Sequence, residues 1–136
     1  MAALVPELLV LDMAASLHFW CDLLGFKVAY ERPPGFAYIE LDGAHVMLCK
    51  RNGVWETGSM EKPLGQGINF QISVRKVDEI FATLSSAGWP IYVEPMISWY
   101  RAGSVELGQK EFLVQDPDGF LVRLAESLGR RPAATA

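Results

Sequence analysis

The chain contains an internal duplication, and this feature constrains the possible fold more than any other. When Gly25 is aligned with Gly88, the hydrophobic positions of the preceding strand and helix coincide in the two halves. A second alignment, of the Asp-Gly pair at 42–43 with that at 118–119, brings the following strands into agreement. One strand–helix–strands unit leaves a sheet face uncovered. The sequence therefore predicts an α+β fold in which two βαβββ repeats form a cleft-lined sheet.

Hydrophobic periodicity and turn residues define the first repeat, residues 4–50. A strand at 8–11 precedes a helix that begins at Asp12 as its N-cap and ends at Gly25 as its C-cap. Three more strands are expected, at 26–31, 36–41 and 45–50. Residues 51–67 contain four glycines, a proline and no periodicity, so we interpret them as the linker between the repeats.

The second repeat, residues 68–126, follows the same order. A strand is expected at 68–74, a helix at 76–87 and further strands at 91–97, 111–115 and 120–125. An irregular segment is expected around 101–108. Residues 129–136 offer nothing to pack and are interpreted as a flexible tail. The chain is thus expected to form a single domain over residues 1–128.

Composition excludes several classes of function. The formal net charge of −4 argues against a nucleic-acid groove and favours cationic partners. No apolar run approaches the roughly 20 residues that span a bilayer, and no signal peptide is evident, so we expect a cytoplasmic protein. Cys21 and Cys49 have no CxxC spacing and are interpreted as free thiols.

Strand alternation sorts side chains between the helix-covered face and an opposite, concave face. The alignment of Leu9 with Ile72 places Glu7 with Phe70 on the helix side. The concave face is predicted to carry both aromatic and polar side chains, as a ligand cleft would. Its members include Phe36, Tyr38, Glu40, His45, Met47, Asn69, Gln71 and Arg123.

Two segments carry a resemblance to a known superfamily. The stretch from Phe19-Trp20 to Leu24-Gly25-Phe26 follows Asp12, and the run at 116–119 reads Asp-Pro-Asp-Gly before a strand. In this order, on top of a duplication, they resemble the vicinal oxygen chelate fold over roughly residues 4–126. That superfamily contains glyoxalases, extradiol dioxygenases, fosfomycin-modifying enzymes and bleomycin-resistance proteins.

The resemblance implies where a metal would be held: on the first and last strand of each repeat. The first strands offer Asn69 and its duplicate Pro6, and the last strands offer Arg123 and either Met47 or Cys49. A guanidinium cannot be deprotonated to bind a cation, and its charge repels one. We therefore expect no metal and no cofactor. The alternative is a slipped register that brings Glu7 and His45 together at a metal.

Loss of the metal with retention of the cleft is similar to the bleomycin-resistance branch, which implies a homodimer that sequesters the drug without altering it. We therefore expect a small-molecule-binding protein rather than an enzyme. A planar ligand would stack on aromatic side chains, and Glu40 or Glu106 would receive its positive charge. The full set of expected ligand-binding residues is Phe36, Tyr38, Glu40, Met47, Asn69, Gln71, Trp99, Tyr100, Glu106, Phe112 and Arg123.

Alternatives remain open. One is a metal-dependent lyase, isomerase or dioxygenase of the same fold, and another is a carrier or regulator for an unrelated small molecule. Trp99 and Tyr100 could pack at a dimer interface as well as against a ligand. Trp55 in the linker is a further aromatic candidate.

Overall fold

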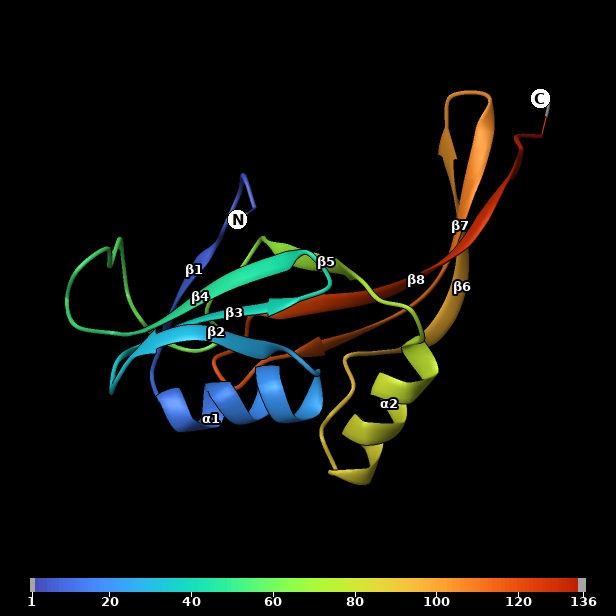
Figure 1. The fold of residues 1–136 in the computed structure, drawn as a ribbon. Coiled ribbons are helices and arrows are strands. Elements are labelled where there is room, and N and C mark those ends of the chain that lie inside the picture. Colours follow the sequence, from blue (N-terminus) through green and yellow to red (C-terminus); the bar gives the residue numbers. More distant parts are fainter. Residues whose placement is uncertain (1, 135–136) are drawn as a thin grey trace. The chain divides into compact units, whose positions relative to one another are not determined.

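The structure is a computed structural model that describes residues 2–134, and it confirms the predicted fold class. Two four-stranded sheets have equivalent strand orders, β1-β4-β3-β2 and β5-β8-β7-β6 (Figure 1). The chain forms two compact units. The first contains the chain up to Ile68 together with Gln115–Phe120, and the second contains Asn69–Val114 and the chain from Leu121 onward.

The first unit follows the predicted order closely. Its first strand is parallel to its last, and its other neighbouring strands are antiparallel. The linker at 51–67 contains no helix or strand, as expected. The elements are β1 (Glu7–Val10), α1 (Met13–Leu17), the π-helix η1 (His18–Leu23), β2 (Lys27–Arg32), β3 (Phe36–Leu41) and β4 (Ala44–Lys50).

The first helix contains one residue more than its duplicate. Its N-cap is Asp12, whose carboxylate accepts a hydrogen bond from Ala15 N at 3.1 Å. Gly25 lies 13 positions after Asp12, whereas Gly88 lies 12 positions after the second N-cap, Lys76. A π-helical turn holds more residues than an α-helical one, and η1 accommodates the extra residue in this way.

This extra residue changes the alignment of the first strands by one position. Leu8 pairs with Leu48, and Leu8 and Val10 are buried, so the equivalent of Ile72 is Leu8 rather than Leu9. The prediction that Glu7 faces the helix is therefore wrong. Glu7 pairs with Met47 and shares its face, away from the helix.

The second unit departs from prediction at its C-terminal strands. β6 and β7 form one long hairpin that turns at Gly103 and Ser104, so the irregular segment expected at 101–108 is wrong. β8 extends to Pro132, so residues 129–132 belong to a strand and not to a flexible tail; residues 135–136 lie outside the described residues. The elements are β5 (Asn69–Ser73), α2 (Val77–Ser86), β6 (Val93–Ala102), β7 (Val105–Gln115) and β8 (Leu121–Pro132).

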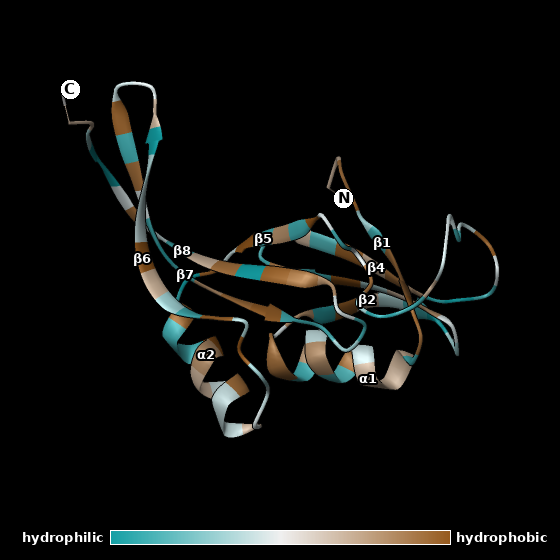
Figure 2. Ribbon diagram, turned by 180° about the vertical axis from the view of Figure 1, so that it is seen from behind, coloured by the Kyte–Doolittle hydropathy of each residue, from teal (hydrophilic) through white to brown (hydrophobic). Residues whose placement is uncertain are grey.

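Contacts between strands stabilise this extension. The Trp99 ring lies on Gly108, where an added Cβ would come within 2.6 Å of it. The Arg131 guanidinium lies 4.0 Å from the centre of the same ring, in cation–π geometry. Ala133 N donates to Ser104 O at 3.0 Å. We call residues 96–102 of β6, 105–111 of β7 and 127–132 of β8 the arm. Hydrophobic and hydrophilic residues alternate along it (Figure 2).

Each unit has its own hydrophobic core between sheet and helix. The first buries residues that include Val10, Phe19, Trp20, Ile39 and Leu48, and the second residues that include Val77, Leu84, Phe112, Val122 and Leu124. Among the described residues, no helix is both long and apolar enough to cross a membrane.

The turn Gln115–Phe120 comes from the second repeat in sequence but belongs to the first unit. Trp20 Nε1 donates to Asp116 at 3.2 Å, and Leu11 N donates to Asp118 at 3.3 Å. Both carboxylates are buried, at 4% and 1% exposure. Burial raises the pKa of Asp116 to about 6, although hydrogen bonds from Phe120 N and Trp20 Nε1 act in the opposite direction.

Candidate functional site

The sheet of the first unit has a ring-rich face on the side away from α1, which we call the first face. Its members include Lys27, Tyr30, Arg32, Phe36, Tyr38, Glu40, His45, Met47 and Cys49. The rings of Tyr30 and Tyr38 stack with centroids 5.0 Å apart, and Phe36 lies 6.0 Å from Tyr30. Tyr30 remains 43% exposed, whereas Tyr38 is only 3% exposed. The first face therefore presents a ring to solvent that is held in place by a buried one.

A polar chain runs from the buried end of this stack. Tyr38 Oη lies 2.7 Å from His45 Nδ1, and His45 Nε2 lies 3.7 Å from a carboxylate oxygen of Glu40. Burial raises the pKa of Tyr38, so its phenol stays protonated at neutral pH and shares a hydrogen bond with Nδ1. A hollow of about 340 Å³ adjoins Glu40, between Lys27 and the turn at 42–43.

The corrected register bears on the alternative of a metal at Glu7 and His45. The two side chains do share the first face, because both lie on the side of Met47. Both nitrogens of His45 already have partners within the unit. Across residues 2–134, no three His, Cys, Asp or Glu side chains come together in a group that could hold a metal ion.

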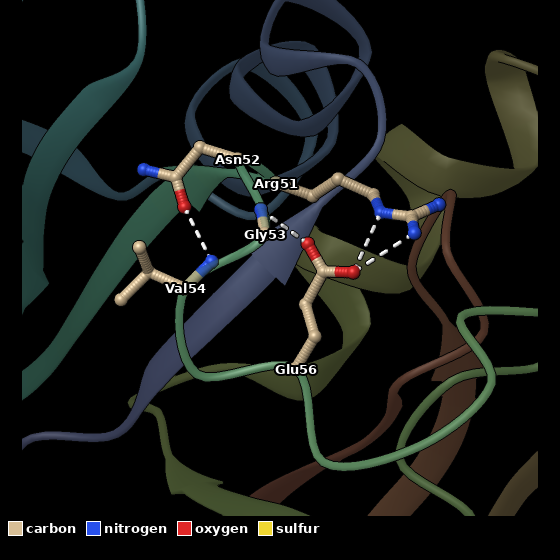
Figure 3. A network of polar contacts seen from close by, with 5 residues as sticks. All are labelled: Arg51, Asn52, Gly53, Val54 and Glu56. Carbon is tan, nitrogen blue, oxygen red and sulfur yellow. Dashed lines mark hydrogen bonds and ion pairs between the residues drawn. The ribbon is translucent and has the colours of Figure 1, made fainter.

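The loop that contains Trp55 is held by a network of polar contacts among Arg51, Gly53 and Glu56 (Figure 3). Glu56 accepts hydrogen bonds from Arg51 Nη2 at 2.8 Å and from Gly53 N at 2.6 Å. The Arg51 hydrogen bond, followed by that of Gly53, lowers the pKa of Glu56. Trp55 itself has a left-handed φ of 63° and is 76% exposed. It lies outside the first face as defined by the strands.

The sheet of the second unit has a polar network on the side away from α2, which we call the second face. Its centre is Glu111, which is 1% exposed. Glu111 accepts hydrogen bonds from Tyr100 Oη and, at 2.6 Å, from Gln109 Nε2. Arg123 Nη1 lies 3.7 Å from Glu111, and Arg123 Nη2 donates to Asn69 at 3.0 Å. The network thus pairs the one buried carboxylate of this face with a guanidinium.

A groove of about 530 Å³ continues the second face along the arm. Gln109 joins the groove to the network, because it contacts both Glu111 and Gln71. The volume is within the range of sites that bind small molecules. Its lining consists of Ser73, Leu107, Gly108, Gln109, Ala125, Ser127, Gly129 and Arg130.

Three predicted site residues of the second unit lie away from the second face. Phe112 has no exposed surface and packs edge-on against Phe81 of α2, with ring centroids 5.3 Å apart, so its predicted place in the cleft is wrong. Trp99 and Glu106 point to the same side as Phe112, since they alternate with the side chains that face the groove. Both contact Arg131 there, and the Glu106–Arg131 ion pair is 2.9 Å long.

The remaining predicted residues fall on one of the two faces. Phe36, Tyr38, Glu40 and Met47 are on the first, and Asn69, Gln71, Tyr100 and Arg123 are on the second. Sequence reasoning did not select Tyr30, Gln109, Glu111 or Arg130. Tyr30 pairs directly with Tyr38 and could have been found from the hairpin register. A buried glutamate such as Glu111 has no comparable signal, because glutamate is usually a surface residue.

Comparison with known proteins adds the family context. A family model described as the Glyoxalase/Bleomycin resistance protein/Dioxygenase superfamily matches residues 3–124. Bleomycin resistance proteins of Geobacillus stearothermophilus and Staphylococcus aureus are each 24% identical over 137 residues, covering 91% of this chain and 96% of theirs.

Solved structures of superfamily members are similar as well. One from Alicyclobacillus acidocaldarius superposes with a TM-score of 0.64 at 17% identity, covering 92% of this chain and 90% of its own, which shows a common fold. One from Vibrio splendidus 12B01 is 37% identical, with coverages of 90% and 95% and a TM-score of 0.43.

Proposed function

Because the chain belongs to the Glyoxalase/Bleomycin resistance protein/Dioxygenase superfamily, we propose that it binds a small molecule without altering it, and that this ligand is planar and cationic, as a bleomycin-type drug is. The observation that carries the proposal is the half-exposed Tyr30 ring, stacked on Tyr38 beside the carboxylate of Glu40. A planar group stacks on such a ring, and a neighbouring carboxylate attracts its positive charge. The similarity to bleomycin resistance proteins supports the same choice of ligand.

We further propose that binding needs no metal. With the corrected alignment, the position equivalent to Asn69 is Val5, which has no ligating side chain. Met47 and Cys49 at the end of the first repeat are soft ligands, unlike the carboxylates and imidazoles that divalent ions of this superfamily would need. Arg123 is held in an ion pair with Glu111 and a hydrogen bond with Asn69. This set of side chains does not fit a divalent metal.

The binding proposal is tested by calorimetric titration of bleomycin into the wild type and Tyr30→Leu. Stacking contributes about 0.5–1.5 kcal/mol beyond buried area, so Tyr30→Leu should weaken binding at least several-fold. Tyr92→Leu, the same change at an exposed position of the second unit, is the matched control and should bind as the wild type does. Mass spectrometry should recover the drug unmodified. No measurable binding would refute the assignment of the ligand, and a modified drug would identify an enzyme.

The metal proposal is tested by elemental analysis of the purified protein. We expect far less than one equivalent of zinc, iron, manganese or nickel per chain. About one equivalent that is lost on chelation, together with a change in activity or ligand binding, would favour the metal-dependent enzyme instead.

We also propose that the protein is a homodimer. Ile97 and Leu128 remain 62% and 39% exposed on the arm, on the side opposite the groove. Exposed apolar side chains that recur on one side of a sheet are typical of an interface. Light scattering should give twice the chain mass at micromolar concentration, and Ile97→Lys should shift the protein toward the monomer. A wild-type monomer would contradict the proposal.

A further inference from the structure

The groove of the second unit is lined by a positive charge. None of its lining residues is acidic, and Arg130 contributes a guanidinium. Arg130 is exposed, and nothing in residues 2–134 forms an ion pair with it. Gly129, with a φ of 90°, interrupts the alternation of β8, so Arg130 follows Ser127 on the groove side. The groove therefore offers an available cation to a ligand.

The polar network beside the groove also favours an anionic ligand over a cationic one. The carboxylate of Glu111 is buried and already accepts hydrogen bonds from Tyr100 and Gln109, so it is not available to a cationic ligand. Arg123 Nε is buried and has no hydrogen-bond partner among the described residues. A buried N–H without an acceptor is costly, and an acceptor supplied by a ligand or a water relieves that cost.

The same face has an apolar wall. Met96, Tyr100 and Leu107 point to the groove side of the arm, and they are 43%, 42% and 47% exposed. A ligand that covered them would remove apolar surface from water. The second face thus combines an apolar wall, amide groups from Gln71 and Gln109, and a guanidinium at one end.

We propose that this groove is a second binding site, for a small organic carboxylate with an apolar body. The carboxylate pairs with Arg130, because a guanidinium presents two parallel N–H groups that match the two oxygens. The body lies along Leu107, which lines the groove, and Tyr100 is the neighbour of Leu107 on β6. A volume of about 530 Å³ accommodates a ligand of two fused rings or a comparable chain. The site is independent of the cationic ligand proposed for the first face.

The test compares three probes of one shape and different charge at pH 7: 2-naphthoate, 2-naphthamide and 2-naphthylmethylammonium. Titrations followed at the amide resonances of Ser73 and Ser127, which line the groove, should show 2-naphthoate binding there at least about tenfold tighter than the other two, since hydrogen bonds to charged groups are the stronger ones. At these resonances, raising the salt concentration should weaken the binding of 2-naphthoate. Equal affinities for the three probes, or tighter binding of 2-naphthyl phosphate than of 2-naphthoate, would overturn the assignment.

Two variants locate the binding. Arg130→Gln should remove the preference for 2-naphthoate, and its exposed position makes a loss of folding no concern. Arg101→Gln is the matched control: Arg101 lies on the opposite side of the arm, where its Nη1 donates to Ala134 O at 3.3 Å. In the wild type, 2-naphthoate should shift the amide resonances of Ser73 and Ser127. Shifts confined to Tyr30 and Tyr38, or an equal loss in both variants, would refute a site in this groove.

Discussion

The two faces are built from equivalent strands of a duplicated unit, yet their chemistry differs. The first face has three aromatic rings, a guanidinium, Arg32, that lies 3.9 Å from the centre of the Phe36 ring, and an exposed carboxylate, Glu40. The second has amides, one tyrosine ring, a buried carboxylate and two guanidinium groups, Arg123 and Arg130. Strand order is the same in both. The comparison teaches that duplication copied a scaffold, and that what each copy binds is determined by a few side chains.

The faces also differ in how deeply their charges are placed. Glu40 is 47% exposed at its side chain, while Glu111 is 1% exposed and depends on groups around it. Water screens the charge of Glu40, whereas the charge of Glu111 is stabilised by the protein groups around it. Matched substitutions in the two faces should therefore have unequal effects on stability.

The largest difference is expected between Glu111→Gln and Glu40→Gln. Glu111→Gln leaves the Arg123 guanidinium without its counter-charge and should lower the free energy of unfolding by roughly 3 kcal/mol. Glu40→Gln should change it by less than about 0.5 kcal/mol, as is usual for exposed positions. Urea denaturation measures both. Equal effects would mean that the buried pair contributes no more than a surface one.

A smaller contrast is expected for the tyrosine hydroxyls. Tyr100→Phe removes a donor from the buried carboxylate of Glu111 and should cost about 2 kcal/mol, since the acceptor is charged. Tyr38→Phe removes a hydrogen bond to the imidazole of His45 and should cost about 1 kcal/mol. Thermal and urea unfolding of the two variants test the order. A greater loss for Tyr38→Phe would reverse our ranking of the two faces.

The smallest effect concerns pH and belongs to the first unit, through Asp116. Its folded pKa of about 6 lies above the unfolded value of 3.8, so the folded protein binds the extra proton. The stabilisation this proton provides is complete below the unfolded pKa and is lost as pH rises through about 6. We expect the free energy of unfolding to rise by about 1 kcal/mol between pH 7 and pH 5 through this group.

Asp116→Asn should remove most of that rise, whatever its effect on stability at pH 7. Asp22→Asn, at an exposed carboxylate on η1 that contacts His18, is the control and should retain it. An unchanged pH dependence in Asp116→Asn would show that another group, such as the buried Asp118, is responsible.

The order of elements could be predicted from sequence because hydrophobic periodicity and Asp-Gly turns are local signals. The strand predicted at 36–41 has those bounds in the structure. The face of β1 was mispredicted because the alignment was anchored at Gly25, and a single added residue in the helix between β1 and Gly25 reverses every side chain of the strand. A π-helix has no reliable sequence signature, so the displacement became visible only in the structure.

The candidate site was less predictable for a related reason. Alternation correctly placed Met47, Gln71 and Arg123 away from the helices, because those strands are short and regular. It could not be used in the arm, where an irregular segment was expected and the stabilising contacts are between strands: Trp99 on Gly108 and under Arg131. The local sequence does not predict such contacts between strands. The groove could not be predicted either, because it forms only when the arm is folded.

The turn Gln115–Phe120, which completes the first unit, has a consequence for synthesis on the ribosome. Trp20 Nε1 and Leu11 N donate to Asp116 and Asp118, which are translated 96 and 107 residues later. The first unit therefore cannot form all of its hydrogen bonds until nearly the whole chain has been synthesised. A nascent chain that stops at the linker exposes the surface this turn will cover, and the two halves of the ancestral duplication can no longer mature one after the other.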